Sequence, residues 1–377
     1  MKLLQPVIWS KGTFLSPQHL QAQDRFLESL FQFRIDALRF RGWGFSRLEI
    51  DQEKLSAGVL AIHRAAGIFP DGLAFEMPQS DQAPPAKPLQ EFFGPDQETI
   101  DAYLAVPNFR PSGVNLSAPD RDLDTRYVAT VATFRDENSG ANERAIQLAR
   151  KNFRLLVEGE PRRGCLAIRA ARIRRLESGN LQLKPHFAPP LLNFTTSEYL
   201  VSIARRLVEV LAAKSGMLAG MRRQKNQSLA EFTTADIANF WLLYTINQHF
   251  PRLRHLFESR HGHPEDLFSV MLSLASTLTT FSVELQPRDL PNYDHDALGD
   301  CFHRLDEQLT NLLETVVPSN FVSLPLRPVR PSIYAASLFE DRFLDNTRLY
   351  LAIQAEMDEA ELIRKAPPLI KVCSATH

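Results

Sequence analysis

Cysteine is scarce in this chain of 377 residues, which contains Cys165, Cys301 and Cys373 and no others. The three lie far apart and form no CxxC motif, and an odd number of cysteines makes a poor disulfide framework. We therefore expect reduced thiols and a cytoplasmic protein.

Long hydrophobic runs are also missing. The most apolar window, residues 207–220, is interrupted by Glu209 and Lys214. No segment therefore reaches the roughly 20 apolar residues that a membrane span needs. The N-terminal sequence MKLLQPVIWSKG has too short an apolar stretch for a signal peptide. The sequence predicts a soluble protein without direct membrane insertion.

An excess of charge of one sign is absent, because 43 Lys and Arg residues balance 44 Asp and Glu residues to a net charge of −1. A basic field over the whole protein, as many nucleic-acid-binding proteins have, is therefore excluded. Residues 141–186 are locally rich in Arg and could face an acidic partner. We favour outward positions of alternating strands instead, because the arginines largely occupy the polar positions of the alternation. No aromatic residues are interleaved for the base stacking that single-strand binding requires. No nucleic-acid partner is predicted.

Motifs for catalysis and cofactor binding are missing as well. The sequence has no phosphate-binding loop, no dinucleotide-binding glycine pattern and no GxSxG elbow. An acidic stretch imitates the start of a calcium loop: Asp120, Asp122 and Asp124. Thr125 stands where that loop requires glycine and Val131 where it requires glutamate, so we interpret the stretch as a solvated loop.

One group of histidines lies close together in sequence: His249, His255, His261 and His263. Their spacing does not place them on one helix face, and no carboxylate or cysteine lies at ligand spacing. We interpret them as surface residues of a loop between helices. The sequence thus predicts no enzyme, no metal and no cofactor.

What the N-terminal half does contain is one helix followed by many short strands. Ser16 and Pro17 suit the start of a helix that runs roughly to residue 39. The hydrophobic period then changes to two, with turn residues between eight strands: 43–50, 58–63, 73–78, 99–107, 126–134, 152–159, 164–173 and 181–187. We predict an N-terminal helix plus an antiparallel β-sandwich over residues 1–190.

Four amphipathic helices are predicted over residues 191–317, as in a helical bundle. The second runs from Thr234 to about Phe250 and is expected to end at Pro251. The fourth carries a regular heptad seam of apolar residues: Leu298, Phe302, Leu305, Leu309 and Leu312. Such a seam packs either within one chain or between copies, and its regularity favours an oligomer. Leu200 and Leu207 of the first helix are expected beside it.

The C-terminal part is punctuated by prolines. Residues 318–331 form a predicted proline-rich linker, and residues 332–377 alternate short apolar runs with a helical stretch. A unit this small can hardly bury its own sheet. We expect a small α/β head domain, and its abrupt end after a strand-like run suggests that the chain stops inside that domain.

Three motifs resemble those of one family, TssK, the baseplate subunit of bacterial type VI secretion systems. The run VIWSKGTFLSPQHLQ, from Val7 to Gln21, resembles the opening of that family. GIFPDG at residues 67–72 resembles a second motif, and Tyr293-Asp294-His295, followed by the heptad seam, resembles a third.

The resemblance implies a homotrimer with three parts. A β-sandwich shoulder, similar to that of phage receptor-binding proteins, would bind the baseplate subunits TssF and TssG. A helical neck would hold the trimer, and a head would reach the membrane-complex subunits TssL and TssM from the cytoplasmic side of the inner membrane. Family members continue beyond the end of this chain, so the head would be incomplete.

Trp9, Phe14 and Leu15 are the candidate residues for baseplate-partner binding. They have two interpretations: they pack into the sandwich, which we favour, or they form the surface that binds other baseplate subunits. For the whole chain, the function predicted is a structural adaptor. The alternative is a phage-tail-like receptor- or carbohydrate-binding protein, against which the reduced cysteines and the single Trp within the β region, Trp43, both argue.

Overall fold

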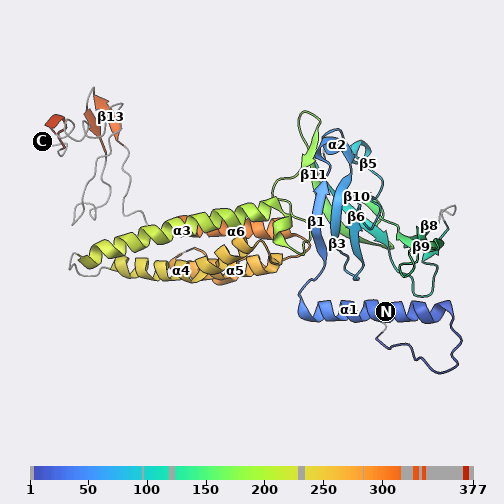
Figure 1. Ribbon diagram of the computed structural model, residues 1–377. Helices are drawn as coiled ribbons and strands as arrows, with labels where there is room; N and C mark the ends of the chain where they lie inside the picture. The colour runs from blue at the N-terminus through green and yellow to red at the C-terminus, as the bar shows by residue number, and fades with distance from the viewer. Residues whose placement is uncertain are drawn as a thin grey trace. The chain divides into compact units, whose positions relative to one another are not determined.

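The computed structural model is a mixed β and α protein with several small sheets (Figure 1). It describes residues 4–95, 97–118, 124–227, 234–282, 284–315, 326–330, 333–336 and 368–372. The chain divides into two compact units, Met1–Val317 and Pro318–His377. Among the described residues, no helix combines the length and apolar composition that a bilayer crossing requires.

Helix α1 (Pro17–Leu38) begins where the sequence predicts. Ser16 is its N-cap and Pro17 its first residue, and the backbone N–H of Ser16 donates to Nδ1 of His19 at 3.3 Å. This contact satisfies the backbone N–H of the residue at the helix start. Gln32 is the buried residue of α1, so most of the helix surface is open to solvent.

Two sheets share the main core of the β region, which we define as residues 44–183. One has the order β1 (Gly44–Ile50), β3 (Ile62–Ile68), β4 (Ala74–Met77), and the other has the order β10 (Arg154–Val157), β6 (Thr99–Pro107), β11 (Cys165–Arg175), β12 (Leu181–Leu183). The pairings within both sheets are antiparallel. Rings of Phe69, Phe75 and Phe153 pack together at centroid distances of 5.3–6.0 Å and join the two sheets.

A third sheet contains β7 (Leu116–Ser117), β8 (Tyr127–Phe134) and β9 (Arg144–Lys151) in that order. Smaller elements complete the region: α2 (Gln52–Ser56), β2 (Val59–Leu60), β5 (Lys87–Pro88) and η1 (Gln90–Phe92). All eight predicted strand segments contain strand, whereas β5, β7 and β9 lie outside them. The structure thus contains several small sheets, and it does not confirm the single sandwich that we predicted.

Helices α3 (Glu198–Gln227), α4 (Thr234–Ser259), α5 (Pro264–Leu278) and α6 (Leu298–Thr315) pack in succession and form the helical region, residues 198–315. Short 3-10 helices lie beside them: η2 (Phe194–Thr196), η3 (Thr279–Phe281) and η4 (Pro287–Asp289).

The prediction that Pro251 ends its helix is wrong, because α4 continues through it to Ser259. Proline normally costs a helix one hydrogen bond and a steric clash. Here Leu253, on the turn after Pro251, is buried in the core and holds the helix together beyond the proline.

In the C-terminal unit, β13 (Arg327–Arg330) and β14 (Ile333–Ala335) form an antiparallel hairpin. Part of the predicted linker 318–331 is therefore strand. Most of the predicted head, residues 332–377, lies outside the described residues, as do Cys373, Asp120 and Asp122.

Candidate functional site: apolar surfaces and a histidine joint

The predicted oligomer seam lies inside a single chain. Every one of its seven residues is buried, at 0–3% exposure: Leu200, Leu207, Leu298, Phe302, Leu305, Leu309 and Leu312. Phe302 packs edge-on against Phe268 of α5 at a ring distance of 5.3 Å. These side chains fill the core between α3, α5 and α6, so in this fold they offer no surface to a second copy. The heptad spacing therefore reflects packing within one chain. The sequence of a single helix does not distinguish such packing from packing between copies.

A different face of the helical region exposes large apolar side chains. On α4, four of them form what we call the aromatic ridge: Ile237, Phe240, Trp241 and Tyr244. Trp241 is 55% exposed, and its ring lies 5.9 Å from that of Phe240 and 5.8 Å from that of Tyr244. Met217 and Met221 are exposed on α3, the helix packed against α4. Clustered exposed aromatic residues are typical of protein–protein contact surfaces.

The start of the chain does not pack into the β region as we favoured. Phe14 is 90% exposed, and Trp9 and Leu15 are also more than half exposed. The Trp9 ring contacts the ring of His19 on α1, at a centroid distance of 6.1 Å, rather than the core of the sheets. The core interpretation of these three residues is therefore wrong, because the segment before α1 runs outside the sheets (Figure 1).

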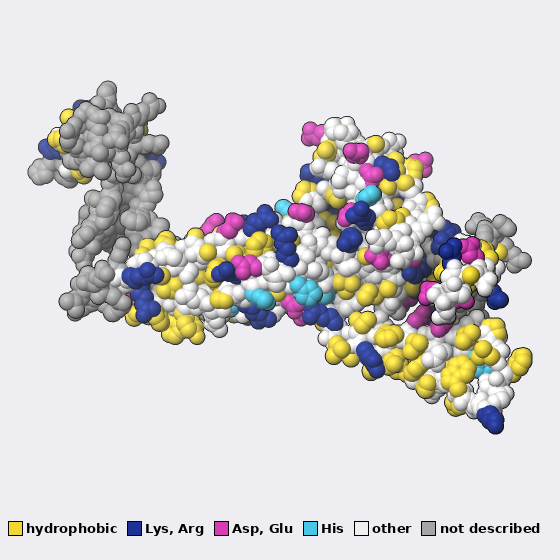
Figure 2. Space-filling view, viewed as in Figure 1, with side chains coloured by type: hydrophobic (Ala, Val, Ile, Leu, Met, Phe, Trp, Pro, Cys, Tyr) yellow, Lys and Arg dark blue, Asp and Glu magenta, His cyan; other side chains and the backbone are white. Residues whose placement is uncertain are grey.

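Helix α1 extends this exposed surface. The helix adds several exposed apolar side chains: Leu20, Leu27, Phe31, Phe33 and Leu38. Together with Ile8, Trp9, Phe14 and Leu15 they form what we call the N-terminal apolar surface. Figure 2 shows hydrophobic side chains gathered over α1. Contiguous exposed apolar patches on a protein surface usually mark interaction sites.

Contacts to the β region hold α1 in place. Gly72 adopts a φ of +93°, and a side chain there would collide with the amide of Gln32 on α1. Glycine is thus required twice over, by its backbone conformation and by the close approach of the helix. Arg25 of α1 places its guanidinium 4.0 Å from the centre of the Phe109 ring. The N-terminal apolar surface is consequently carried on a fixed helix.

The GIFPDG motif also forms an ion pair with a buried arginine. The Asp71 carboxylate lies 2.6 Å from the Arg126 guanidinium, whose side chain is 3% exposed. Arg126 also donates to the carbonyl of Pro107 at 3.2 Å. Gly67 lies opposite Phe45 in the β1–β3 pairing, where an added Cβ would collide with the Gly44 carbonyl. The motif therefore has a structural explanation at three of its residues.

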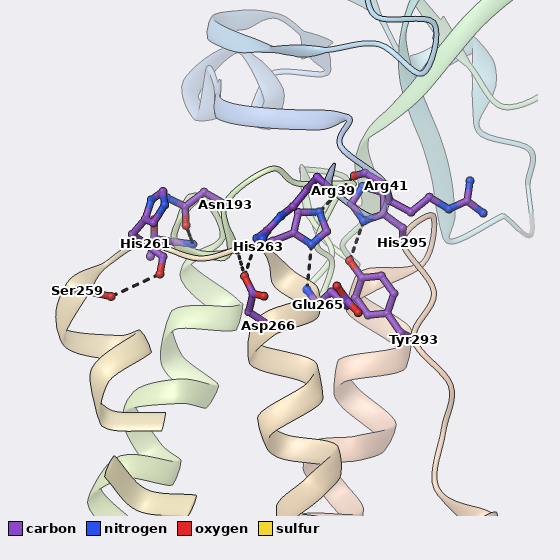
Figure 3. Close-up of polar contacts among 11 residues, drawn as sticks. Arg39, Arg41, Asn193, Ser259, His261, His263, Glu265, Asp266, Tyr293 and His295 are labelled. Carbon is purple, nitrogen blue, oxygen red and sulfur yellow. Dashed lines mark hydrogen bonds and ion pairs between the residues drawn. The ribbon is translucent and has the colours of Figure 1, made fainter. Parts of the chain in front are cut away.

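Two buried histidines join the β region to the helical region (Figure 3). His263, the N-cap of α5, lies with Nε2 3.2 Å from the carbonyl of Arg41, in the segment between α1 and β1. Its Nδ1 accepts from the backbone N–H of Glu265 at 3.2 Å. Because a carbonyl only accepts, Nε2 carries the proton and the ring is neutral.

His295, in the segment before α6, makes the second contact. Its Nε2 lies 2.8 Å from the carbonyl of Trp43, and its Nδ1 lies 2.7 Å from the hydroxyl of Tyr293. Its ring stacks on His263 at 5.2 Å and meets the Trp43 ring edge-on at 4.8 Å. Both histidines thus use the same tautomer to bind a backbone carbonyl, and we call this group the histidine joint.

An ion pair at the edge of the histidine joint adds a third connection. Arg39, the C-cap of α1, lies 2.6 Å from Asp266 in the first turn of α5. Burial lowers the pKa of His295 to about 4, although its hydrogen bond to Trp43 opposes the shift. Burial likewise lowers the pKa of His263. The joint is therefore built for neutral histidines.

The interpretation of the histidine group as surface residues is wrong for two of its members. His249 is buried in α4, where its ring contacts the carbonyl of Thr245 and the hydroxyl of Ser273. His263 is buried in the joint. Over the described part of the chain, no group of His, Cys, Asp and Glu side chains has the arrangement of a metal site.

The arginines of β11 are not simply outward-facing. Arg169 and Arg172 are partly buried, and both lie within 3.4 Å of the Asp101 carboxylate on the neighbouring strand β6. The hydrogen bond to Asp101 raises the pKa of Arg172. Asp101 therefore pairs with two of the basic side chains of residues 141–186 within the sheet.

Relatives of known identity agree with the motif resemblance. The family described as "Bacterial Type VI secretion, VC_A0110, EvfL, ImpJ, VasE" matches residues 19–377. The type VI secretion system baseplate component TssK1 of Pseudomonas aeruginosa is 32% identical over 375 residues, which cover 98% of this chain and 83% of that protein.

Solved structures with the same fold include a baseplate complex from the type VI secretion system, with a TM-score of 0.79 and 28% identity over 97% of this chain and 82% of that chain. A crystal structure of TssK matches with a TM-score of 0.75 and 27% identity, over 91% of this chain and 77% of that chain. A TssK-TssF-TssG baseplate subcomplex matches with a TM-score of 0.73 and 27% identity, over 82% of this chain and 99% of that chain. On this sequence and structural evidence, the chain belongs to the TssK (VasE) family of type VI secretion proteins.

Proposed function

We propose that this protein is a structural adaptor of a type VI secretion baseplate. The observation that carries the proposal is the N-terminal apolar surface, which a fixed helix and the segment before it present to solvent. One relative is named as a baseplate component, and another is named for a subcomplex with TssF and TssG. In this proposal, the N-terminal apolar surface binds the TssF and TssG subunits of the same system.

The proposed adaptor is a homotrimer. The aromatic ridge on α4 supports this part, since it exposes Trp241 and Tyr244 on a helical region whose heptad seam is already filled. Aromatic side chains contribute much of the binding energy at protein interfaces. We assign the ridge to contact between copies, in place of the seven seam residues.

The C-terminal unit has a separate proposed role. By resemblance to the family, we assign contact with the membrane-complex subunits TssL and TssM to the predicted head, residues 332–377, on the cytoplasmic side of the inner membrane. The adaptor then links the baseplate to that complex. No catalytic step is part of this role.

The test is co-purification with the TssF and TssG subunits of the same secretion system. The double variant Phe14→Ala, Leu15→Ala removes two exposed side chains and should abolish co-purification without lowering the melting temperature. Val114→Ala removes an exposed apolar side chain elsewhere in the β region and should leave binding intact. Undiminished binding by the double variant would overturn the assignment of this surface. Binding of the wild type to glycans, and not to TssF or TssG, would favour a receptor- or carbohydrate-binding protein.

A further inference from the structure

Strand β9 has a long free edge. In the order β7-β8-β9 it is the last strand, and within the described part of the chain it pairs with β8 alone. Its eight residues run in unbroken register with β8, from Arg144 opposite Phe134 to Lys151 opposite Tyr127. Natural sheets usually protect such an edge with a bulge, a proline, a very short strand or charged side chains. β9 has none of these between residues 145 and 149.

The register shows which backbone groups face that edge. The N–H of Asn152 donates to the carbonyl of Arg126 at 2.9 Å, so these opposite residues form a hydrogen-bonded pair. Hydrogen-bonded and free pairs alternate along an antiparallel ladder. The even-numbered residues of β9 therefore bond to β8, and the backbone groups of Ala145, Gln147, Ala149 and Lys151 point to the free edge.

One face of β9 is apolar at its centre and basic at both ends. Because side chains alternate along a strand, Arg144, Ile146, Leu148 and Arg150 share a face. Ile146 is 46% exposed and Leu148 is 42% exposed, although both are large apolar residues in a strand. Arg150 donates to the neutral side chain of Gln82, and among the described residues neither Arg144 nor Arg150 has a carboxylate partner.

The end of β9 nearest the main sheets is fixed. The ammonium group of Lys151 lies 2.9 Å from the carboxylate of Asp81, which is buried in the turn after β4. Beyond Tyr127 and Val128, where β7 pairs with β8, strands β8 and β9 form a two-stranded ribbon, and a two-stranded ribbon by itself is marginally stable in water. Anchoring one end keeps the ribbon in place, and a further strand would complete it.

The charges decide what kind of strand fits. A second copy of β9, added antiparallel about Gln147, would put Arg144 of each copy opposite Arg150 of the other, and like charges directly opposite are unfavourable. A strand with carboxylates at those two places would be attracted instead.

We propose that the free edge of β9 docks an extended segment of another protein, added antiparallel, with apolar side chains beside Ile146 and Leu148 and carboxylates beside Arg144 and Arg150. Main-chain hydrogen bonds supply affinity in such strand addition, and the alternating side chains supply specificity. This site is separate from the N-terminal apolar surface of the proposed function.

The probe is a fluorescein-labelled peptide of the sequence Glu-Thr-Val-Thr-Val-Thr-Glu, which matches residues 144–150 in either direction. Its binding to the intact protein is followed by fluorescence anisotropy. Two control peptides replace both Glu residues by Lys, or the central Thr by Pro. We expect each control to bind at least about tenfold more weakly, and the parent peptide to weaken with added salt.

The matched protein variants are Gln147→Pro and Gln147→Thr. Proline removes an outward N–H and is tolerated on an edge strand, whereas threonine keeps that N–H. We expect Gln147→Pro to bind the peptide at least about tenfold more weakly and Gln147→Thr to bind it as the wild type does. If Gln147→Pro fails to fold, the two control peptides still test the proposal on the wild type.

Three results would overturn the proposal: no binding of the parent peptide, equal binding of the lysine peptide, or unchanged binding by folded Gln147→Pro. Light scattering provides a fourth test. A lower mass for Gln147→Pro than for the wild type would show that the edge joins copies of this chain, and this result would also overturn the proposal. Because Phe14 and Leu15 lie outside this strand, the double variant at those residues should bind the peptide normally, so the two proposals fail independently.

Discussion

The imidazole of His295 donates from Nε2 to the main-chain carbonyl of Trp43 across 2.8 Å, and its ring meets the Trp43 ring edge-on at 4.8 Å. These residues are 252 positions apart in the sequence. Through this contact the segment before α6 fixes the residue just before β1 and connects the helical region to the β region.

Removing this contact should destabilise the protein. His295→Ala leaves a cavity and an unpaired buried carbonyl, and we expect the free energy of unfolding to fall by about 3 kcal/mol. Urea denaturation followed by circular dichroism measures it. His255→Ala, at an exposed position of α4, is the control and should change the free energy of unfolding by less than about 0.5 kcal/mol. Equal stability of the two variants would contradict the role of the joint.

The joint also predicts loss of stability in mild acid. Burial lowers the pKa of His295 to about 4, below the usual value of 6.5, and also lowers that of His263. A depressed pKa means that the unfolded chain takes up the proton first as the pH falls. The stabilisation is therefore complete above pH 6.5 and is lost between pH 6.5 and 4, at about 1.4 kcal/mol per pH unit for each proton.

Urea denaturation at several pH values tests this dependence. The His295→Ala variant lacks one of the two groups, so its stability should fall less steeply than that of the wild type across the same pH range. Identical slopes would show that His295 is not protonated on unfolding and would refute this account of the joint.

The filled heptad seam predicts a folding defect rather than simple dissociation. Leu305→Asp would bury an unpaired charge in the core of one chain, at a cost of about 4 kcal/mol or more. We expect loss of helical signal or a much lower melting temperature. A variant that keeps its melting temperature and becomes monomeric would show that Leu305 lies between copies after all.

The aromatic ridge predicts the opposite behaviour. Trp241→Glu changes an exposed residue, so the chain should keep its melting temperature. In the proposed homotrimer the introduced charge would face the apolar surface of the next copy. Light scattering should then give three times the 42.8 kDa chain mass for the wild type and a lower value for the variant. A monomeric wild type would overturn the homotrimer.

The Asp71–Arg126 pair should stabilise the fold more than an exposed pair does. Asp71→Ala leaves the Arg126 guanidinium buried with one partner fewer, and we expect a loss of about 2 kcal/mol in the free energy of unfolding. Glu49→Ala breaks the exposed pair with Arg64, whose charged groups lie 3.9 Å apart, and should cost less than about 1 kcal/mol. Thermal or urea denaturation compares the two.

Local patterns in the sequence were sufficient to predict most elements. Ser16 and Pro17 fix the start of α1, and alternating apolar residues in segments such as 99–107 predict β6 with its observed bounds. β9 was missed because both of its faces are exposed, so its sequence lacks a clear division into an apolar and a polar side. Pro251 misled the prediction because tertiary packing beyond it outweighs the local cost of a proline.

The sequence by itself determined the family, the absence of familiar catalytic motifs, and the order of a helix, strands and then helices, since short-range motifs and hydrophobic periods carry that information. The tertiary structure decided which apolar residues are core and which are surface. Leu305 and Trp241 both lie at helical spacing in their own segments, but one is buried and the other is exposed. Periodicity shows that a helix has an apolar face, whereas only the packing of the other helices shows whether that face is already covered.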